Sequence, residues 1–290
     1  MNFNALPPVI IIGMHRSGTT ILARILEELG LFVGYKKNEK NNEALFFYKL
    51  NEWMLDQANA TWDNPHNFNF INDFFKKEIV RVLNFHLKGF RRFEYLGFKN
   101  FLKYKDVRNL DFPWGWKDPV NTFTVNIWKE IFPKAKVLHI YRNPVDVAES
   151  LRNREILVKK NFHRNFKKVV KEILLLGKVY YQYSLRIQNL LEGIKLWQEY
   201  VEKALSLDAD FKENILHLRY ETFLESHEEI LKNILTFLGL KVKESDIFKV
   251  AKNISSDRKF AFTREKELIE VYNQIRDKDI MKKLGYYNII

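Results

Sequence analysis

The chain has 290 residues, 46% of them hydrophobic, so it can bury a sizeable core as one large domain or two small ones. It has no cysteine, which excludes disulfides and thiolate metal sites and is typical of a reducing compartment such as the cytoplasm. Its net charge of +12, from 48 Lys+Arg against 36 Asp+Glu, favours anionic ligands.

The first predicted elements are a strand, a loop and a helix. The apolar run Val9–Ile12 has no basic residue before it, so it indicates a buried first strand rather than a signal peptide. No apolar run approaches the roughly 18 residues that span a membrane. After the loop Gly13–Thr20, helical spacing is shown by Ile21, Leu22, Ile25, Leu26 and Leu29.

This loop predicts an anion site, because backbone N–H groups and the helix dipole both favour negative charge at a helix N-terminus. Gly13 and Gly18 have the G-x4-G spacing of a nucleotide P-loop. The residue after the second glycine is Thr19, where a P-loop has Lys. That departure argues against an ordinary NTPase.

Apolar runs that do not alternate predict buried parallel strands. They are Val9–Ile12, Leu31–Val33, Lys136–Tyr141 and Ile215–Tyr220, with Trp114–Trp116 as a further candidate. Apolar periodicity predicts one helix from Ile187 to Val201 and another from Ile230 to Leu238, which Gly239 ends. We therefore expect a single α/β domain over residues 1–290, with three layers around a parallel sheet of about five strands. Its ligands should lie at the carboxyl ends of the strands.

Residues 46–112 lack this strand–helix rhythm and are crowded with aromatic side chains. We interpret the segment as an insertion of helices and loops that contributes to an acceptor pocket. Most of these aromatic residues are expected in the core, although aromatic faces also suit sugars and apolar alcohols.

A second anion site is predicted where the strand Lys136–Tyr141 ends. Arg142 follows the strand, Asn143 is a good helix N-cap, and Pro144 is a good first helical residue. Ser150 lies about two helical turns further on, on nearly the same face as Arg142. A guanidinium and a hydroxyl there suit a phosphate, although Arg142 pairing with a neighbouring carboxylate is equally consistent with the pattern.

The two predicted anion sites occur in the same order along the chain as in the PAPS-dependent sulfotransferases. The chain resembles this family, in particular its bacterial and tyrosylprotein-type members. The resemblance spans most of the chain in the right order, with residues 50–112 poorly covered. It is carried by Pro8–Thr20, by Trp116-Lys117-Asp118-Pro119, by Arg142–Ser150, by Arg219-Tyr220-Glu221 and by Phe237-Leu238-Gly239-Leu240.

The resemblance implies a P-loop-like α/β fold that binds 3′-phosphoadenosine 5′-phosphosulfate (PAPS) and releases adenosine 3′,5′-bisphosphate (PAP). It implies in-line transfer of the sulfuryl group to a hydroxyl or amine, with no metal. The 3′-phosphate would lie on Arg142 and Ser150, and Arg16 and Lys117 would meet the charge on the leaving oxygen. The 5′-phosphosulfate would lie in the loop on His15, Arg16, Ser17, Gly18, Thr19 and Thr20.

Family members use a Glu or a His as the general base for the acceptor proton. The segment Glu39–Glu43, after the first helix, matches the place where tyrosylprotein-type members have a Glu, so the resemblance implies Glu43, with Glu39 and His66 as alternatives. A solvated loop carboxylate is as consistent with the sequence. The segment Ser255–Lys259 has no glycine, unlike the late basic segment of cytosolic members, so a phosphate contact from Arg258 or Lys259 is left open.

Two other function classes remain open at this point. A nucleotide kinase or NTPase would have Lys at the position of Thr19 and a strand ending in a metal-binding Asp, whereas Arg142 follows the strand here. A non-catalytic anion-binding module would need clustered basic residues, and the segment from Lys159 to Lys168 is a modest cluster. We expect a hydroxyl-bearing acceptor and no nucleic acid; acceptor identity and oligomeric state are not indicated.

Overall fold

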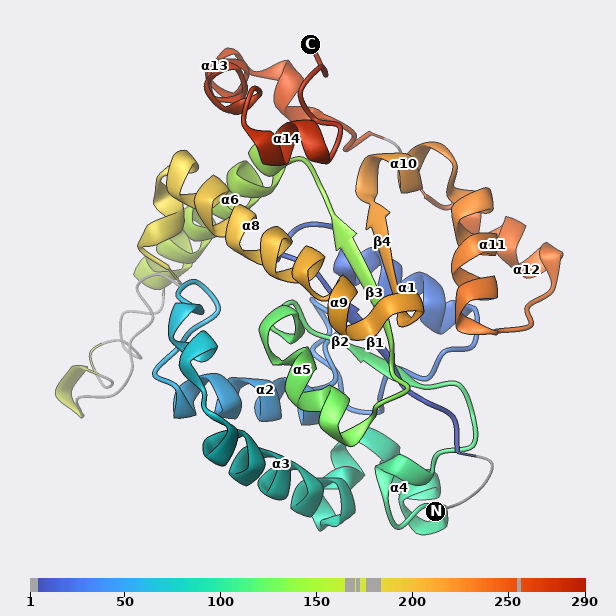
Figure 1. The fold of residues 1–290 in the computed structure, drawn as a ribbon. Coiled ribbons are helices and arrows are strands. Elements are labelled where there is room, and N and C mark those ends of the chain that lie inside the picture. Colours follow the sequence, from blue (N-terminus) through green and yellow to red (C-terminus); the bar gives the residue numbers. More distant parts are fainter. Residues whose placement is uncertain (1–4, 165–169, 171–172, 176–183, 255–256) are drawn as a thin grey trace. The chain divides into compact units, whose positions relative to one another are not determined.

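The structure is a computed structural model that describes residues 5–164, 170, 173–175, 184–254 and 257–290 (Figure 1). Lys167, Lys168, Ser255 and Ser256, considered above, lie outside these residues. The chain forms two compact units. The first comprises residues 1–142 and 200–259, and the second comprises 143–199 and 260–290. The single domain expected from the sequence stays a prediction.

The first unit is built on a fully parallel sheet of four strands in the described part of the chain, in the order β2-β1-β3-β4. The strands are β1 Val9–Ile12, β2 Gly115–Lys117, β3 Lys136–Tyr141 and β4 Ile215–Arg219. β1 pairs Ile11 with Lys117 on one side and with Leu138 on the other. This register brings the carboxyl ends of β1 and β2 together, where the predicted anion loop begins.

One predicted strand did not form. Leu31–Val33 makes a single bridge, in which Phe32 pairs with Trp114, and it adds no strand to the sheet. Gly30 and Gly34 flank it at φ values of 100° and 111°, so the backbone turns on both sides of this short extended stretch. The tryptophan-rich candidate strand does form, displaced by one residue as β2.

Helices cover both faces of the sheet. α1 Thr19–Glu28, α10 Tyr220–Glu225, α11 His227–Leu238 and α12 Glu244–Ala251 share one apolar core with Val9, Leu138 and Leu218. α5 Asn121–Ile131 packs against β1. The unit also contains α9 Asp208–Phe211 and the short 3₁₀ turn Lys212–Asn214, which precede β4. The expected three-layer α/β architecture is confirmed, and Gly239 ends α11 in the left-handed conformation as predicted.

The aromatic-rich insertion is helical, as expected. It contains α2 Leu45–Gln57, α3 Asp73–Lys88 and α4 Phe93–Lys103, and 3₁₀ turns at His66–Phe70, Phe90–Arg92 and Val107–Asn109. α2 and α3 pack on α5, and the ring of Phe47 stacks on that of Trp116 at 3.8 Å. Several rings expected in the core are instead 70–78% exposed: Phe70, Phe74, Phe85, Phe90 and Phe98.

The second unit is a helical assembly. It contains α6 Pro144–Arg164, α13 Lys266–Ile275 and α14 Asp279–Lys283, with 3₁₀ turns at Arg186–Gln188 and Ala261–Arg264. α8, which spans Leu190–Ser206, belongs to this unit as far as Glu199 and to the first unit from Tyr200. The buried Asp146 of α6 accepts a hydrogen bond from the backbone of Phe262 at 2.8 Å, which ties α6 to the C-terminal segment.

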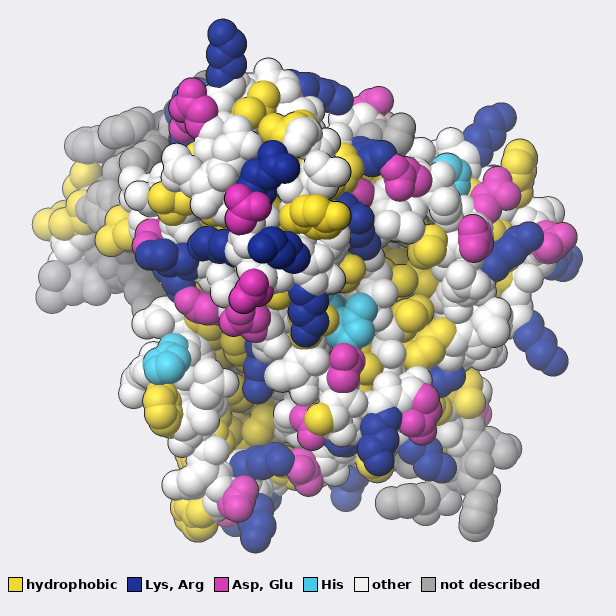
Figure 2. Space-filling view, turned by 45° about the horizontal axis from the view of Figure 1, so that its top comes forward, with side chains coloured by type: hydrophobic (Ala, Val, Ile, Leu, Met, Phe, Trp, Pro, Cys, Tyr) yellow, Lys and Arg dark blue, Asp and Glu magenta, His cyan; other side chains and the backbone are white. Residues whose placement is uncertain are grey.

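Charged side chains of both signs are interspersed on the face shown in Figure 2, where Lys and Arg lie among Asp and Glu. This distribution is typical of a solvated surface and does not favour a nucleic-acid patch on that face. None of the helices in the described ranges has the length and apolar character required to cross a membrane.

Candidate active site

The loop Gly13–Thr20 joins β1 to α1, and its two glycines are required by close packing. Gly13 has φ 132°, and a Cβ atom there would lie 2.2 Å from the carbonyl oxygen of Ile140. Gly18 has φ 101°, and a Cβ atom would lie 2.5 Å from the ring of Tyr220. The two glycines thus let the loop pack closely against β3 and against Tyr220 of α10 before the chain enters α1.

The loop is held by one hydrogen bond within its own backbone and by one to a side chain of α5. The Ser17 N–H donates to the carbonyl of Met14 at 3.1 Å, and the Gly13 N–H donates to Oγ1 of Thr122 at 3.1 Å. Arg16 has φ 71°, which is rare for a residue other than glycine, and its side chain is exposed. The loop therefore presents Arg16 to solvent at the N-terminus of α1, the positive end of the helix dipole.

Other polar side chains of the loop are partly enclosed. Ser17 and Thr19 are buried, and Ser17 Oγ has no hydrogen-bond partner in the described ranges. Thr20 Oγ1 donates to the carbonyl of Asn41 at 3.2 Å, and the His15 ring lies 4.8 Å from that of Trp62. A buried hydroxyl without a partner is uncommon in native proteins, so Ser17 offers hydrogen-bonding capacity to a ligand of the loop.

Lys117 and Glu43 form a buried ion pair beside this loop. Lys117 ends β2, and its Nζ lies 2.9 Å from Oε1 of Glu43, with the side chains 1% and 5% exposed. Glu43 precedes α2 and is held by a turn in which the Asn38 N–H donates to the Glu43 carbonyl at 2.9 Å. Lys117 is therefore not a surface lysine, and the structure brings two predicted site residues into contact.

Asp118 is a buried residue of this site that the sequence analysis did not select. Burial, reinforced by the charge of Glu43, raises its pKa to about 7. Asn51 Nδ2 donates to its Oδ2 at 2.8 Å, and the Val120 N–H donates to Oδ1 at 3.0 Å. The Lys-Asp-Pro motif was the signal for this residue, but only the fold shows that its carboxyl is enclosed.

Asn51 is the second site residue missed from the sequence. It also donates to Oδ1 of Asn121 at 2.7 Å, and its own Oδ1 accepts from Thr124 and Trp128 at 2.9 Å. This network fixes α2 to the segment that follows Lys117. Asn51 lies in the insertion, where the sequence offered no motif to select it.

Arg142 follows β3 and is 6% exposed. Its Nη2 donates to the backbone carbonyl of Arg258 at 2.8 Å, and its guanidinium lies 5.0 Å from the centroid of the Tyr220 ring. The guanidinium of Arg142 thus contacts a backbone carbonyl and the face of an aromatic ring. The hydrogen bond to the carbonyl places Arg258 beside the residue that follows β3.

The helix start predicted after Arg142 is confirmed. Asn143 Oδ1 accepts from the N–H groups of Val145 and Asp146 at 3.0 and 3.4 Å, and Pro144 is the first residue of α6. Ser150 lies on α6 in the second unit and is half-buried. Its pairing with Arg142 stays a prediction.

The three candidates for a proton acceptor differ in their surroundings. Glu43 contacts Lys117, whereas Glu39 and His66 are exposed. The carbonyl of Glu39 accepts from Arg24 at 3.1 Å, and the His66 ring packs on Phe70 at 5.2 Å. Of the three, Glu43 is the one that the described structure joins to the other site residues.

The arrangement as a whole is a lysine-free anion loop with a buried ammonium–carboxylate pair beside it, at the carboxyl edge of a parallel sheet. The described residues contain no group of three or more His, Cys, Asp or Glu side chains suited to hold a metal ion. Such a site defines a class of proteins that bind an anionic ligand and place a cation and a base beside it.

A family model described as the sulfotransferase family matches residues 7–244, which include all four strands and every site residue described here. The chain therefore belongs to the sulfotransferase family.

Individual relatives are more distant. The chain is 30% identical over 158 residues to a 3-beta-hydroxysteroid sulfotransferase of Cavia porcellus, a match covering 52% of this chain and 48% of that protein. It thus spans about half the length of this curated relative.

A solved structure with a TM-score above 0.5 shows the same fold. The sulfotransferase domain from the curacin biosynthetic pathway aligns with a TM-score of 0.51 at 14% identity, covering 94% of this chain and 99% of that one. A sulfotransferase from Alicyclobacillus acidocaldarius aligns with a TM-score of 0.48 at 17% identity, covering 99% and 98%.

Proposed function

We propose that this chain is a PAPS-dependent sulfotransferase that moves the sulfuryl group of PAPS to a hydroxyl or amine of an acceptor. The observation that carries the proposal is the Lys117–Glu43 pair, buried at 2.9 Å beside an anion loop that has Thr19 in place of the P-loop Lys. Function as a nucleotide kinase is disfavoured because Arg142, and not a metal-binding Asp, follows β3.

In the proposed reaction the acceptor oxygen attacks sulfur, and a new S–O bond forms. The bond from sulfur to the 5′-phosphate oxygen breaks, and its electron pair leaves on PAP. The acceptor proton goes to Glu43. The leaving oxygen gains negative charge, so cations placed beside it lower the barrier.

Lys117 can serve in this step without leaving Glu43. Its ammonium has three N–H donors, and one of them points to Oε1 of Glu43. The remaining two are available to donor oxygens, and Arg16 supplies a second positive charge from the loop. A sulfuryl group carries a single negative charge, so we expect no requirement for Mg²⁺.

The remaining contacts of the donor follow the two predicted anion sites. The phosphosulfate would lie on backbone N–H groups from His15 to Thr20 and on the hydroxyls of Ser17, Thr19 and Thr20. The 3′-phosphate would lie on Arg142 and Ser150. The unpartnered hydroxyl of Ser17 supports the first assignment, and the enclosed guanidinium of Arg142 supports the second. We also propose a hydroxyl-bearing acceptor and a cytoplasmic location.

Thermal unfolding with two ligands tests the proposal. A ligand present at 100 times its Kd stabilises the folded state by about 2.7 kcal/mol, which for a chain of this size raises Tm by about 5 °C. PAP in EDTA should produce this rise, whereas ATP with Mg²⁺ should not. The rise should be lost in Arg142→Ala and kept in Arg276→Ala, which replaces the arginine at the C-terminal cap of α13. A rise with ATP–Mg²⁺ alone would instead support a kinase.

A further inference from the structure

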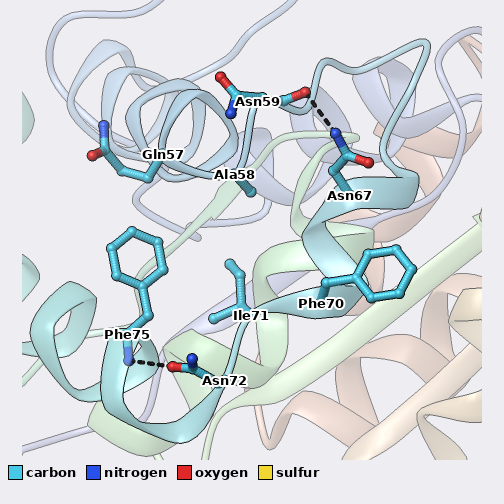
Figure 3. A pocket seen from close by; sticks show the side chains of 8 residues that line it. All are labelled: Gln57, Ala58, Asn59, Asn67, Phe70, Ile71, Asn72 and Phe75. Atoms are coloured by element: carbon cyan, nitrogen blue, oxygen red, sulfur yellow. Dashed lines mark hydrogen bonds between the residues drawn. The ribbon is translucent and has the colours of Figure 1, made fainter.

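The insertion contains a cavity that the site above does not use. It has a volume of about 390 Å³ and lies between the end of α2 and the start of α3 (Figure 3). This volume is in the range of sites that bind small molecules. The cavity is lined by Gln57, Ala58, Asn59, Asn67, Phe70, Ile71, Asn72 and Phe75.

Half of the lining side chains are carboxamides, and none of the lining residues is charged, although 29% of the residues in the chain are. Asn67 Nδ2 donates to the carbonyl of Asn59 at 3.2 Å, and Asn72 Oδ1 accepts from the Phe75 N–H at 2.9 Å. Asn67 Oδ1, Asn72 Nδ2 and the amides of Gln57 and Asn59 have no such partner within the described ranges.

A carboxamide both donates and accepts hydrogen bonds, and so does a hydroxyl group. Several carboxamides around one cavity therefore match a ligand with several hydroxyl groups. A carboxylate, sulfate or phosphate would find no cation among the lining residues, so the lining favours a neutral ligand over an anionic glycan or an acidic peptide.

Two aromatic rings complete the lining. Figure 3 shows Phe70 and Phe75 on either side of Ile71, with Gln57, Asn59 and Asn67 on one side of the cavity and Asn72 on the other. Phe70 is 72% exposed, so the cavity is open beside this ring. A sugar ring has an apolar C–H face for an aromatic ring and hydroxyl groups at its edge for the amides. A sterol would leave the carboxamides desolvated and unpaired.

α2 joins this cavity to the transfer site. Asn51 of α2 bonds to Asp118, next to Lys117, and Gln57 at the end of the same helix lines the cavity. Glu43 precedes Leu45, the first residue of α2, and Gln57 is the last, so the cavity lies about 18 Å along the helix axis from the Glu43 end of the transfer site. One rigid helix therefore sets the spacing between the reacting groups and the cavity.

We infer that this cavity binds a neutral sugar ring of an oligosaccharide acceptor, whose chain spans the length of α2 to bring a hydroxyl group of another ring to Lys117 and Glu43. The role as acceptor site rests on the proposed transferase function. The binding of a neutral sugar does not.

The test uses the whole protein saturated with PAP and a panel of neutral oligosaccharides built from glucose, galactose, mannose and N-acetylglucosamine. Calorimetry measures binding in the wild type, in Phe70→Ala and in Phe74→Ala. Phe74 is a matched control, because it is 74% exposed and lies outside the cavity. At least one oligosaccharide should bind, with affinity at least fivefold weaker in Phe70→Ala and unchanged in Phe74→Ala.

Gln57→Glu, at an exposed position, adds a test of charge. It should preserve folding and weaken binding of the same oligosaccharide. Failure of every neutral oligosaccharide to bind, or an equal effect of both phenylalanine variants, would overturn the inference. Binding of a 3β-hydroxysterol that depends on Phe70, without sugar binding, would overturn it as well. A thermal shift with PAP that persists while sugar binding fails would leave the transferase proposal standing, so the two failures are distinguishable.

Discussion

At the scale of single residues, the buried pair of Lys117 and Glu43 is the feature on which the proposed chemistry depends. Both side chains are at most 5% exposed, so each charge relies on the other. Removing one partner of such a pair leaves an uncompensated buried charge, at a cost of about 3–5 kcal/mol. The pair therefore affects stability as well as turnover, and experiments on it must separate the two.

We expect Glu43→Gln to lower kcat by about 100-fold or more, because a positioned general base contributes about 10²–10⁴ in rate. It should also destabilise the protein by about 3–5 kcal/mol, since the buried Lys117 loses its ion-pair partner. The double variant Glu43→Gln/Lys117→Met should recover most of that stability in urea unfolding but none of the activity. Full activity in the folded Glu43→Gln variant would exclude Glu43 as the base.

Asp118 predicts a pH dependence of stability. Its pKa is about 7 in the folded protein and about 3.9 in an unfolded chain. Between these values the unfolded state releases a proton that the folded state keeps, so Asp118 makes stability fall as pH rises, with a slope of up to about 1.4 kcal/mol per pH unit.

Asp118→Asn removes the ionisable carboxyl group and keeps a side chain of nearly the same size beside Asn51. Urea unfolding from pH 4.5 to 8 should show that the variant gains stability relative to the wild type as pH rises toward 7. A stability difference between the two proteins that is independent of pH would contradict the raised pKa.

At the scale of elements, the glycines of the β1–α1 loop differ from glycines that only end a helix. Gly13→Ala would place a Cβ atom 2.2 Å from a backbone oxygen of β3, whereas Gly30→Ala, at φ 100°, would meet no atom within 4 Å. We expect Gly30→Ala to cost about 1–2 kcal/mol. Gly13→Ala should cost at least about 3 kcal/mol, because strain and overpacking add. Equal costs in chemical unfolding would show that the loop is not packed against β3.

The neighbouring strands β3 and β4 are linked by a histidine pair. The ring nitrogens of His139 and His217 lie 2.7 Å apart, and His217 reaches Asp208 of α9 at 2.7 Å. Burial, together with His217, holds the pKa of His139 well below 6.5. As pH falls below about 6.5 the unfolded state takes up a proton that folded His139 does not, so stability is lost.

His139→Leu cannot take up this proton. Its stability should fall less steeply than that of the wild type between pH 6.5 and pH 5, as measured by urea unfolding midpoints. Parallel profiles of the two proteins would show that His139 titrates normally in the folded state.

Elements with strong local patterns were predicted well. The strands β1, β3 and β4 follow from apolar runs that do not alternate, and α11 follows from helical spacing ended by Gly239. The Leu31–Val33 strand failed because flanking glycines turn the chain after a single bridge. A local pattern carries no information about how many neighbours a short extended segment will find.

The site was only partly predictable for the same reason. Lys117 and Glu43 could be selected singly, but their contact joins positions 74 residues apart. Asp118 and Asn51 were missed because their importance comes from burial against each other, which only tertiary packing creates. The sequence likewise could not show which of the aromatic rings lie outside the core, and the exposed Phe70 at the open cavity is one of them.

At the scale of the whole molecule, the net charge of +12 favours association with an anionic donor such as PAPS. On the face shown in Figure 2 charges of both signs are interspersed, so this face presents no dedicated basic surface. Of the residues proposed to bind the donor, those of the loop, Lys117 and Arg142 lie in the first unit, whereas Ser150 lies in the second.

The central claim is sulfuryl transfer without a metal, and it is tested most directly with labelled PAPS in EDTA and the panel of neutral oligosaccharides. We predict that label moves to an acceptor with the wild type. Lys117→Ala should reduce this transfer at least 100-fold while the Kd for PAP changes less than fivefold. Transfer that requires Mg²⁺, or PAP binding with no transfer to any hydroxyl acceptor, would contradict the account.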